Sequence, residues 1–111
     1  MLKEVAGIRR VVLKTGRTDL RRGIDGLKAI IQLNGMDPLE KGTLYLFCGC
    51  RNDRIRGLTF EGDGFLLLTK RLSGENRFQW PRNEEDMKGI TMGQYRNLME
   101  GFTVEGSIRE V

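Results

Sequence analysis

The chain of 111 residues carries 19 basic and 15 acidic side chains, a net charge of +4, and contains no histidine. This length and a hydrophobic fraction of 39% predict a single domain over residues 1–111 with its own core. Without histidine, a Ser-His or Cys-His nucleophile is excluded. The amino terminus lacks the apolar stretch of a signal peptide, and no run approaches the roughly 20 apolar residues of a membrane span. We therefore expect a cytoplasmic protein with no membrane partner.

The charge is distributed unevenly along the chain. Residues 9–82 carry 15 lysines and arginines against eight aspartates and glutamates, whereas residues 83–111 carry three against six. A basic body with an acidic end is typical of a surface that faces a polyanion. An ordinary solvated surface is the alternative that composition leaves open.

The amino-terminal third predicts a strand followed by a helix. Ile8–Leu13 is rich in β-branched and apolar residues, as strands are, and a loop over residues 15–18 follows. From Leu20 to Ile31 the apolar residues recur at steps of four, three and four, which predicts an amphipathic helix that begins at Asp19. Thr18 is expected to cap this helix, and the pair Asn34-Gly35 is expected to end it.

The opening turns of this predicted helix contain residues that helix stability does not favour. Two arginines and two glycines stand there, although helix propensity disfavours glycine and the helix dipole disfavours a cation. Arg21 is spaced to pair with Asp25 one turn later. Backbone N–H groups at a helix start favour an anion, so a phosphate near Arg17, Arg21 and Arg22 would explain these choices. Pairing with acidic residues of a partner protein or of the chain's own acidic end is the alternative.

The middle of the chain predicts a series of strands. Thr43–Cys48 is apolar on both faces and is expected to lie centrally in a sheet. Arg54–Glu61 loses its alternation at Gly57, which predicts a β-bulge there. A glycine-rich turn leads to a strand over Phe65–Leu72, and a further short strand is expected to end at Trp80-Pro81. Four strands in sequence predict an antiparallel meander.

The carboxyl-terminal part predicts a polar linker over residues 83–86 and a second helix. Thr91 is placed to cap this helix, whose apolar face repeats up to Met99, and Gly101 is its stop signal. The last ten residues are ambiguous between a short strand and a frayed tail. The fold class is therefore expected to be α+β, with an antiparallel β-meander sheet of about five strands and two helices.

The residues that could support catalysis or metal binding are few. Cys48 and Cys50 are too close in an extended strand to bridge each other easily, and they supply half of the ligands of a tetrahedral zinc site. We expect free thiols, with Cys48 in the core. Glu61 and Asp63 flank a turn whose geometry explains both residues. We therefore expect no catalytic site, no metal and no cofactor.

Basic residues interleaved with aromatic ones form the remaining pattern. Arginines contact phosphates and exposed aromatic rings stack on bases, although the aromatic residues of so small a domain are mostly buried. The residues predicted to bind nucleic acid or a protein partner are Arg17, Arg21, Arg22, Arg51, Arg54, Arg56, Lys70, Arg71, Arg77 and Trp80.

Several short motifs lie along the chain in a fixed order. They are Thr18–Leu27, Asp37-Pro38, Leu44–Gly49, Gly62–Phe65, Lys70–Leu72 and Arg77–Pro81. In order and spacing they resemble the small accessory protein of the insertion-sequence-66 family of bacterial transposable elements, over about residues 8–101. The resemblance implies a non-enzymatic role in transposition, a form of DNA recombination, beside a separate transposase that holds the catalytic acids.

Two partners follow from this resemblance, the element DNA and the transposase. Direct contact of the basic surface with DNA is the favoured mechanism. An adaptor that binds the transposase without contacting DNA, or a regulatory binding module, is the alternative.

Overall fold

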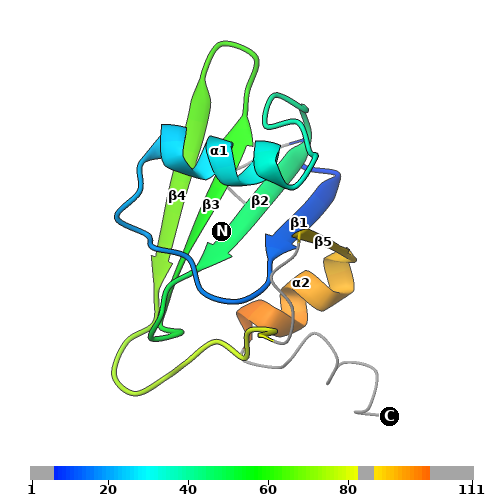
Figure 1. The fold of residues 1–111 in the computed structure, drawn as a ribbon. Coiled ribbons are helices and arrows are strands. Elements are labelled where there is room, and N and C mark those ends of the chain that lie inside the picture. The colour runs from blue at the N-terminus through cyan, green and yellow to red at the C-terminus, as the bar shows by residue number, and fades with distance from the viewer. Residues whose placement is uncertain (1–6, 83–86, 101–111) are drawn as a thin grey trace.

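The computed structural model describes residues 7–82 and 87–100, which form a sheet with helices packed against it (Figure 1). In chain order the elements are β1 (Arg10–Lys14), α1 (Ile24–Leu33), β2 (Thr43–Cys48), β3 (Arg54–Phe60), β4 (Phe65–Arg71), β5 (Met87–Ile90) and α2 (Met92–Met99). The predicted α+β class is confirmed. Neither described helix is long and apolar enough to cross a membrane.

The sheet has the strand order β4-β3-β2-β1-β5 and is mixed. β1 and β2 are parallel, with Val11 opposite Leu44, and every other pair is antiparallel. The prediction of a purely antiparallel meander is therefore wrong, since only β2, β3 and β4 follow that pattern. The reason is the connection through α1, which returns the chain to the starting end of β1 so that β2 runs in the same direction.

The fifth strand comes from a different segment than the sequence predicts. Residues 72–82 contain no strand, so the predicted short strand ending at Trp80-Pro81 is wrong. Phe78 and Trp80 are instead held by burial, at 1% and 5% exposure. β5 takes the edge position and pairs with β1, placing Ile90 opposite Val11. Its four residues, one of them glycine, are too short to show a periodic pattern, and the predicted linker lies outside the described residues.

β3 has regular pairing on both sides. Gly57 lies opposite Leu46 of β2 and Leu68 of β4 in uninterrupted registers, so the predicted bulge is wrong. The alternation is lost because both faces of the strand are covered. Ile55 belongs to one hydrophobic core and Leu58 to the other.

The two cores lie on opposite faces of the sheet. On one face, Leu27 and Ile31 of α1 pack with Tyr45 and Phe47, and Figure 1 shows α1 crossing this face. On the other face, buried residues of α2 and the 78–80 segment pack with Leu44, Leu46 and Cys48. All six residues of β2 are buried between these layers, which confirms its predicted central place.

The two helices begin in different ways. At the start of α2, Thr91 Oγ1 accepts a hydrogen bond of 3.0 Å from Gln94 N–H, and Gln94 Oε1 accepts one of 2.8 Å from Thr91 N–H. The predicted cap is thus confirmed, whereas the predicted stop at Gly101 lies outside the described residues. α1 instead has Gly23 at its N-cap with no side-chain hydrogen bond, so the prediction that Thr18 caps it is wrong.

The late start of α1 has a packing reason. The N–H of Thr18 donates to the carbonyl of Cys48 at 2.8 Å, which ties this segment to the end of β2. Leu20 belongs to the same core as Leu27 and Ile31. The regular apolar spacing from Leu20 therefore reflects burial in one core and not a continuous helix.

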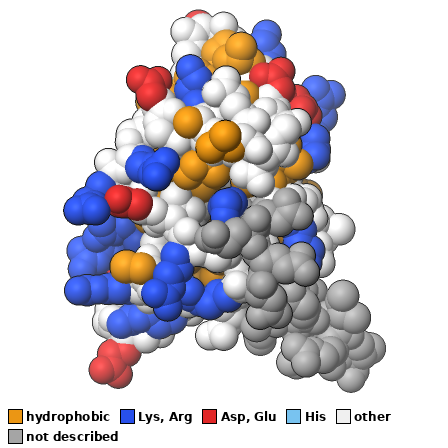
Figure 2. Space-filling model, in the orientation of Figure 1, with side chains coloured by type: hydrophobic (Ala, Val, Ile, Leu, Met, Phe, Trp, Pro, Cys, Tyr) orange, Lys and Arg blue, Asp and Glu red, His pale blue; other side chains and the backbone are white. Residues whose placement is uncertain are grey.

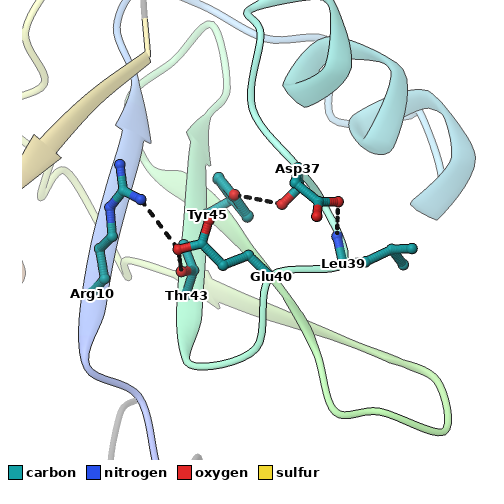
Figure 3. A network of polar contacts seen from close by, with 6 residues as sticks. All are labelled: Arg10, Asp37, Leu39, Glu40, Thr43 and Tyr45. Atoms are coloured by element: carbon teal, nitrogen blue, oxygen red, sulfur yellow. Dashed lines mark hydrogen bonds and ion pairs between the residues drawn. The ribbon is translucent and has the colours of Figure 1, made fainter.

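The loop between α1 and β2 is held at the amino end of the parallel strands by polar contacts (Figure 3). The carboxylate of Glu40 accepts from Arg10 Nη1 at 3.2 Å and from Thr43 Oγ1 at 3.1 Å. The hydroxyl of Tyr45 donates to the carbonyl of Asp37 at 2.8 Å. At this end of the sheet a basic side chain therefore has an acidic partner.

Candidate nucleic-acid interface

An open hollow of about 610 Å³ lies at the opposite end of the sheet, where β1 and β2 finish. Six arginines line it: Arg17, Arg21, Arg51, Arg54, Arg56 and Arg71. We call this site the arginine hollow. Figure 2 shows basic side chains gathered on the lower left of one face, over the start of β3 and the end of β4. Six of the ten residues predicted to bind a partner therefore lie together.

Strand pairing places three of these arginines on the face that α1 covers. Arg54 of β3 lies directly opposite Arg71 of β4. Side chains two residues apart share a face of a strand, so Arg56 projects on the same side as Arg54 and as Leu58, which packs in the α1 core. Like charges directly opposite each other destabilise a sheet. Strand stability therefore does not explain these residues.

The loop after β1 brings Arg17 and Arg21 to the hollow. Between them, Leu20 is only 9% exposed and Thr18 is bonded to the end of β2. A Cβ atom on Gly49 would lie 3.1 Å from Leu20 Cδ1. The absence of a side chain at Gly49 thus allows the loop to pack closely on the turn after β2.

The turn over residues 49–53 carries Arg51 and is held by main-chain hydrogen bonds. Gly49 N–H donates to the carbonyl of Arg54 at 3.0 Å. Leu72 N–H donates to Asp53 O at 2.7 Å, and Phe78 N–H donates to Asn52 O at 2.6 Å. Asn52 takes the left-handed conformation, with φ of 60°, that asparagine tolerates better than most residues. Two later segments of the chain therefore fix this wall of the hollow.

One of the six arginines has an acidic partner. Asp19 Oδ1 accepts from Arg21 Nε, and Asp19 Oδ2 accepts from Arg21 Nη2, both at 3.0 Å. Asp19 Oδ1 also accepts from the backbone N–H of Arg21 at 3.0 Å. These hydrogen bonds lower the pKa of Asp19 to about 2, with the side-chain bond from Arg21 the largest cause. The predicted pairing of Arg21 with Asp25 is wrong. Arg21 precedes the start of α1 and is paired with Asp19 instead.

The other five arginines of the hollow make no ion pair with any residue in the ranges 7–82 and 87–100. Arg56 Nε is in addition buried without a hydrogen-bond partner there. Besides Asp19, the lining includes one further acid, Asp53. The site therefore carries a surplus of positive charge, which an anionic ligand would offset.

Two of the remaining predicted residues do not line the hollow. Arg22 folds back on the first turn of α1, where a Cβ on Gly26 would lie 2.8 Å from Arg22 Cβ. Arg77 is exposed and donates to the carbonyls of Gly74 and Asn76 at 3.3 and 2.8 Å.

The last two predicted residues belong to the opposite face of the sheet. The ammonium group of Lys70 lies 6.0 Å from the ring centre of Phe78. Trp80 is buried, and its indole N–H donates to the carbonyl of Lys14 at 2.8 Å. The ring of Trp80 therefore serves the core, and it is not exposed for stacking on a base.

The two cysteines occupy contrasting positions, and both are free thiols, as predicted. Burial raises the pKa of Cys48 to about 12, whereas Cys50 is exposed and lines the arginine hollow. Sequence reasoning misses the roles of Leu20 and Asp53 in the lining. The i to i+2 spacing of Asp19 and Arg21, which is typical of an Asx turn, is the signal that could have revealed their pairing.

Within the described residues, no cluster of three or more histidine, cysteine, aspartate or glutamate side chains could hold a metal.

The fold and the hollow define a small α+β protein with an arginine-lined surface site. Residues 9–108 match the family described as IS66 Orf2 like protein. The chain therefore belongs to this family, as its motifs predict, and this membership associates it with transposition as an accessory protein.

Two proteins of Sinorhizobium fredii (strain NBRC 101917 / NGR234) are similar to the chain. "Uncharacterized protein y4hO" is 34% identical over 94 residues, covering 84% of this chain and 80% of that protein. "Uncharacterized protein y4jC" is 27% identical over 93 residues, covering 84% and 79% respectively. No solved structure gives a significant match.

Proposed function

We propose that the protein acts in transposition by binding DNA of the mobile element through the arginine hollow. The observation that carries this proposal is the set of five arginines that line one hollow without an ion pair in the described chain. Guanidinium groups bind phosphate oxygens in a fork geometry, and they keep their charge at every physiological pH. A bound phosphate would also offset the repulsion between Arg54 and Arg71.

Family membership supports the process, and the chemistry of the site supports the ligand. Transposition takes place on DNA, so the protein is expected to work in the bacterial cytoplasm. The contrast with the amino end of the sheet strengthens this assignment. One basic residue there, Arg10, is neutralised by Glu40 in a polar network, whereas five arginines of the hollow have no such partner in the described residues.

We further propose that the protein is an accessory factor without nuclease activity of its own. Phosphoryl transfer by the two-metal route needs clustered acids around the ions. Asp19 accepts hydrogen bonds from Arg21 and lies among arginines. Glu61 and Asp63 lie in the β3–β4 turn, at the other end of these strands from the hollow. Purified protein with Mg²⁺ or Mn²⁺ is expected not to nick supercoiled DNA, and nicking that disappears in a Glu61→Gln, Asp63→Asn variant would overturn this part.

The test of DNA binding is affinity as a function of salt. For a labelled duplex, the logarithm of the binding constant should fall against log salt with a slope of about −0.9 per phosphate contacted. The double variant Arg54→Gln, Arg71→Gln should bind more weakly and lower the size of the slope by about two. The matched control is Arg9→Gln, Lys41→Gln, which removes the same charge at the amino end of the parallel strands.

Three outcomes would overturn the proposal. They are no binding at low salt, a flat salt profile, and an equal loss of affinity in the two double variants. If DNA does not bind but purified transposase does, and the Arg54→Gln, Arg71→Gln variant abolishes that binding, the hollow is a protein-docking site.

A further inference from the structure

The lining of the arginine hollow contains groups that a phosphate site does not need. Leu20 and the exposed Cys50 contribute apolar surface, and the acidic residue Asp53 is part of the lining. A carboxylate repels phosphate, and apolar surface gains nothing from a hydrated phosphodiester chain. The ligand that fits this lining therefore has an apolar part and hydrogen-bond donors as well as negative charge.

A nucleotide base supplies the missing features. Its ring faces are apolar and stack on guanidinium planes, which the hollow offers in number. Its amino groups donate hydrogen bonds, and aspartate accepts them, as it does from the amino group of cytosine. The phosphate attached to the same nucleotide would contact the neighbouring arginines.

The shape of the site limits which nucleotides can enter. The volume of about 610 Å³ lies within the range of pockets that hold small organic ligands, about 300–1,000 Å³. A continuous duplex presents phosphates and sugars outward and keeps its bases stacked, so its backbone would span the rim and leave the interior unfilled. An unpaired nucleotide places its base inside.

The walls of the hollow are also set before any ligand arrives. The 49–53 turn is fixed by hydrogen bonds from Leu72 and Phe78, and Thr18 is bonded to the end of β2. A site that is already ordered loses little conformational entropy on binding a single nucleotide.

We propose that the arginine hollow holds an unpaired nucleotide, so that the protein prefers single-stranded DNA or a single-stranded end over continuous duplex. This inference rests on the proposed DNA-binding function and names its substrate class.

The first test compares three fluorescent probes at one salt concentration: a blunt duplex, the same duplex with a short single-stranded end, and one strand alone. The end-bearing duplex and the single strand should bind about tenfold more tightly than the blunt duplex, the scale of one stacked base. Equal affinity for all three probes with a steep salt dependence would overturn this inference and leave the proposed function intact. Binding of none of them would overturn both.

The second test uses Cys50 as a reporter inside the hollow. Cys48 is buried and the pKa of its thiol is raised to about 12, so a thiol reagent such as iodoacetamide should label Cys50 first. Saturating single strand should slow this labelling severalfold, whereas blunt duplex at saturation should slow it much less. The Cys50→Ser variant identifies the labelled thiol. Equal protection by both probes would contradict the inference.

The third test fills the hollow without changing its charge. Cys50→Leu, which adds bulk without an aromatic ring, should keep salt-dependent duplex binding and weaken the preference for the single-stranded end, whereas Cys50→Ser should keep both. Cys50 is exposed, so both variants should fold, which thermal unfolding checks. A Cys50→Leu protein that retains the full preference would contradict the entry of the base into the hollow beside Cys50.

Discussion

The centre of the sheet and the arginine hollow lie on the same strands but differ in how their side chains affect stability. β3 carries both regions, with Leu58 buried in the α1 core and Arg54 at the start of the strand, opposite Arg71. In the centre all six residues of β2 are buried. At the hollow, like charges face each other in the ladder, which destabilises the sheet. The fold therefore concentrates its stability in the centre and tolerates an unfavourable arrangement at the hollow.

This division makes stability and binding separable by mutation. Changes in the centre should unfold the protein, and changes in the hollow should affect the ligand. Each of the following variants tests one side of that comparison.

The largest effect is expected in the α1 core. Leu27 and Ile31 are fully buried, so Leu27→Ala or Ile31→Ala should lower the free energy of unfolding by about 2–5 kcal/mol, because a cavity remains. Leu33→Ala on the same helix is the matched control, since Leu33 is 85% exposed and should change stability by about 0.5 kcal/mol or less. Urea denaturation measures both values. Equal effects at Leu27 and Leu33 would contradict the proposed packing of α1.

A smaller effect is expected at the start of α2. Thr91→Ala removes the hydrogen bond to Gln94 N–H and should lower the free energy of unfolding by about 0.5–2 kcal/mol. Gly23→Ser at the uncapped start of α1 should instead raise it by a few tenths of a kcal/mol, since a hydroxyl there can accept from the first turn. Thermal unfolding of the two variants compares the helix ends. If Thr91→Ala is neutral, the capping box does not contribute to stability.

In the hollow, charge removal is expected to change stability little and in the opposite direction. Arg54→Gln or Arg71→Gln should raise the free energy of unfolding by about 0.2–1 kcal/mol at low salt, because each relieves the same cross-strand repulsion. The double variant should gain less than the sum, and added salt should shrink the gains. Unfolding of the protein by either single change would assign these arginines a structural role and contradict the separation of the two regions.

The sequence predicts those features that depend on neighbouring residues and misses those that depend on pairing at a distance. The two-faced pattern of Thr43–Cys48 and the Thr91 cap are local, so both are visible in the chain. The parallel pairing of β1 and β2 depends on where α1 packs, and the pairing of β5 with β1 joins residues almost 80 positions apart. Neither leaves a periodic signal.

The candidate site shows the same limit. Arginine content and motif order predict a set of candidate binding residues. The strand register determines which members of that set lie side by side. Arg54 and Arg71 are 17 positions apart and face each other, whereas Lys70, next to Arg71, projects from the other face beside Phe78. Trp80 matches a base-stacking pattern in sequence and is buried in the fold.

The smallest effect concerns the one paired arginine of the hollow. The pKa of Asp19 is lowered from 3.8 to about 2, chiefly by the side-chain hydrogen bond from Arg21. Because the folded-state pKa lies below the unfolded value, the stabilisation is present above about pH 4 and is lost as pH falls toward 2. Both side chains are solvent-accessible, so the loss of stability should be slight and the titration itself is the better readout.

Arg21→Gln should move the pKa of Asp19 back toward 3.8 in a carboxyl NMR titration, and Arg22→Gln, which acts only through its more distant charge, should move it much less. Equal shifts in the two variants would mean that Asp19 senses the general field of the hollow, in which case Arg21 would count with the unpaired arginines as a contact for the ligand.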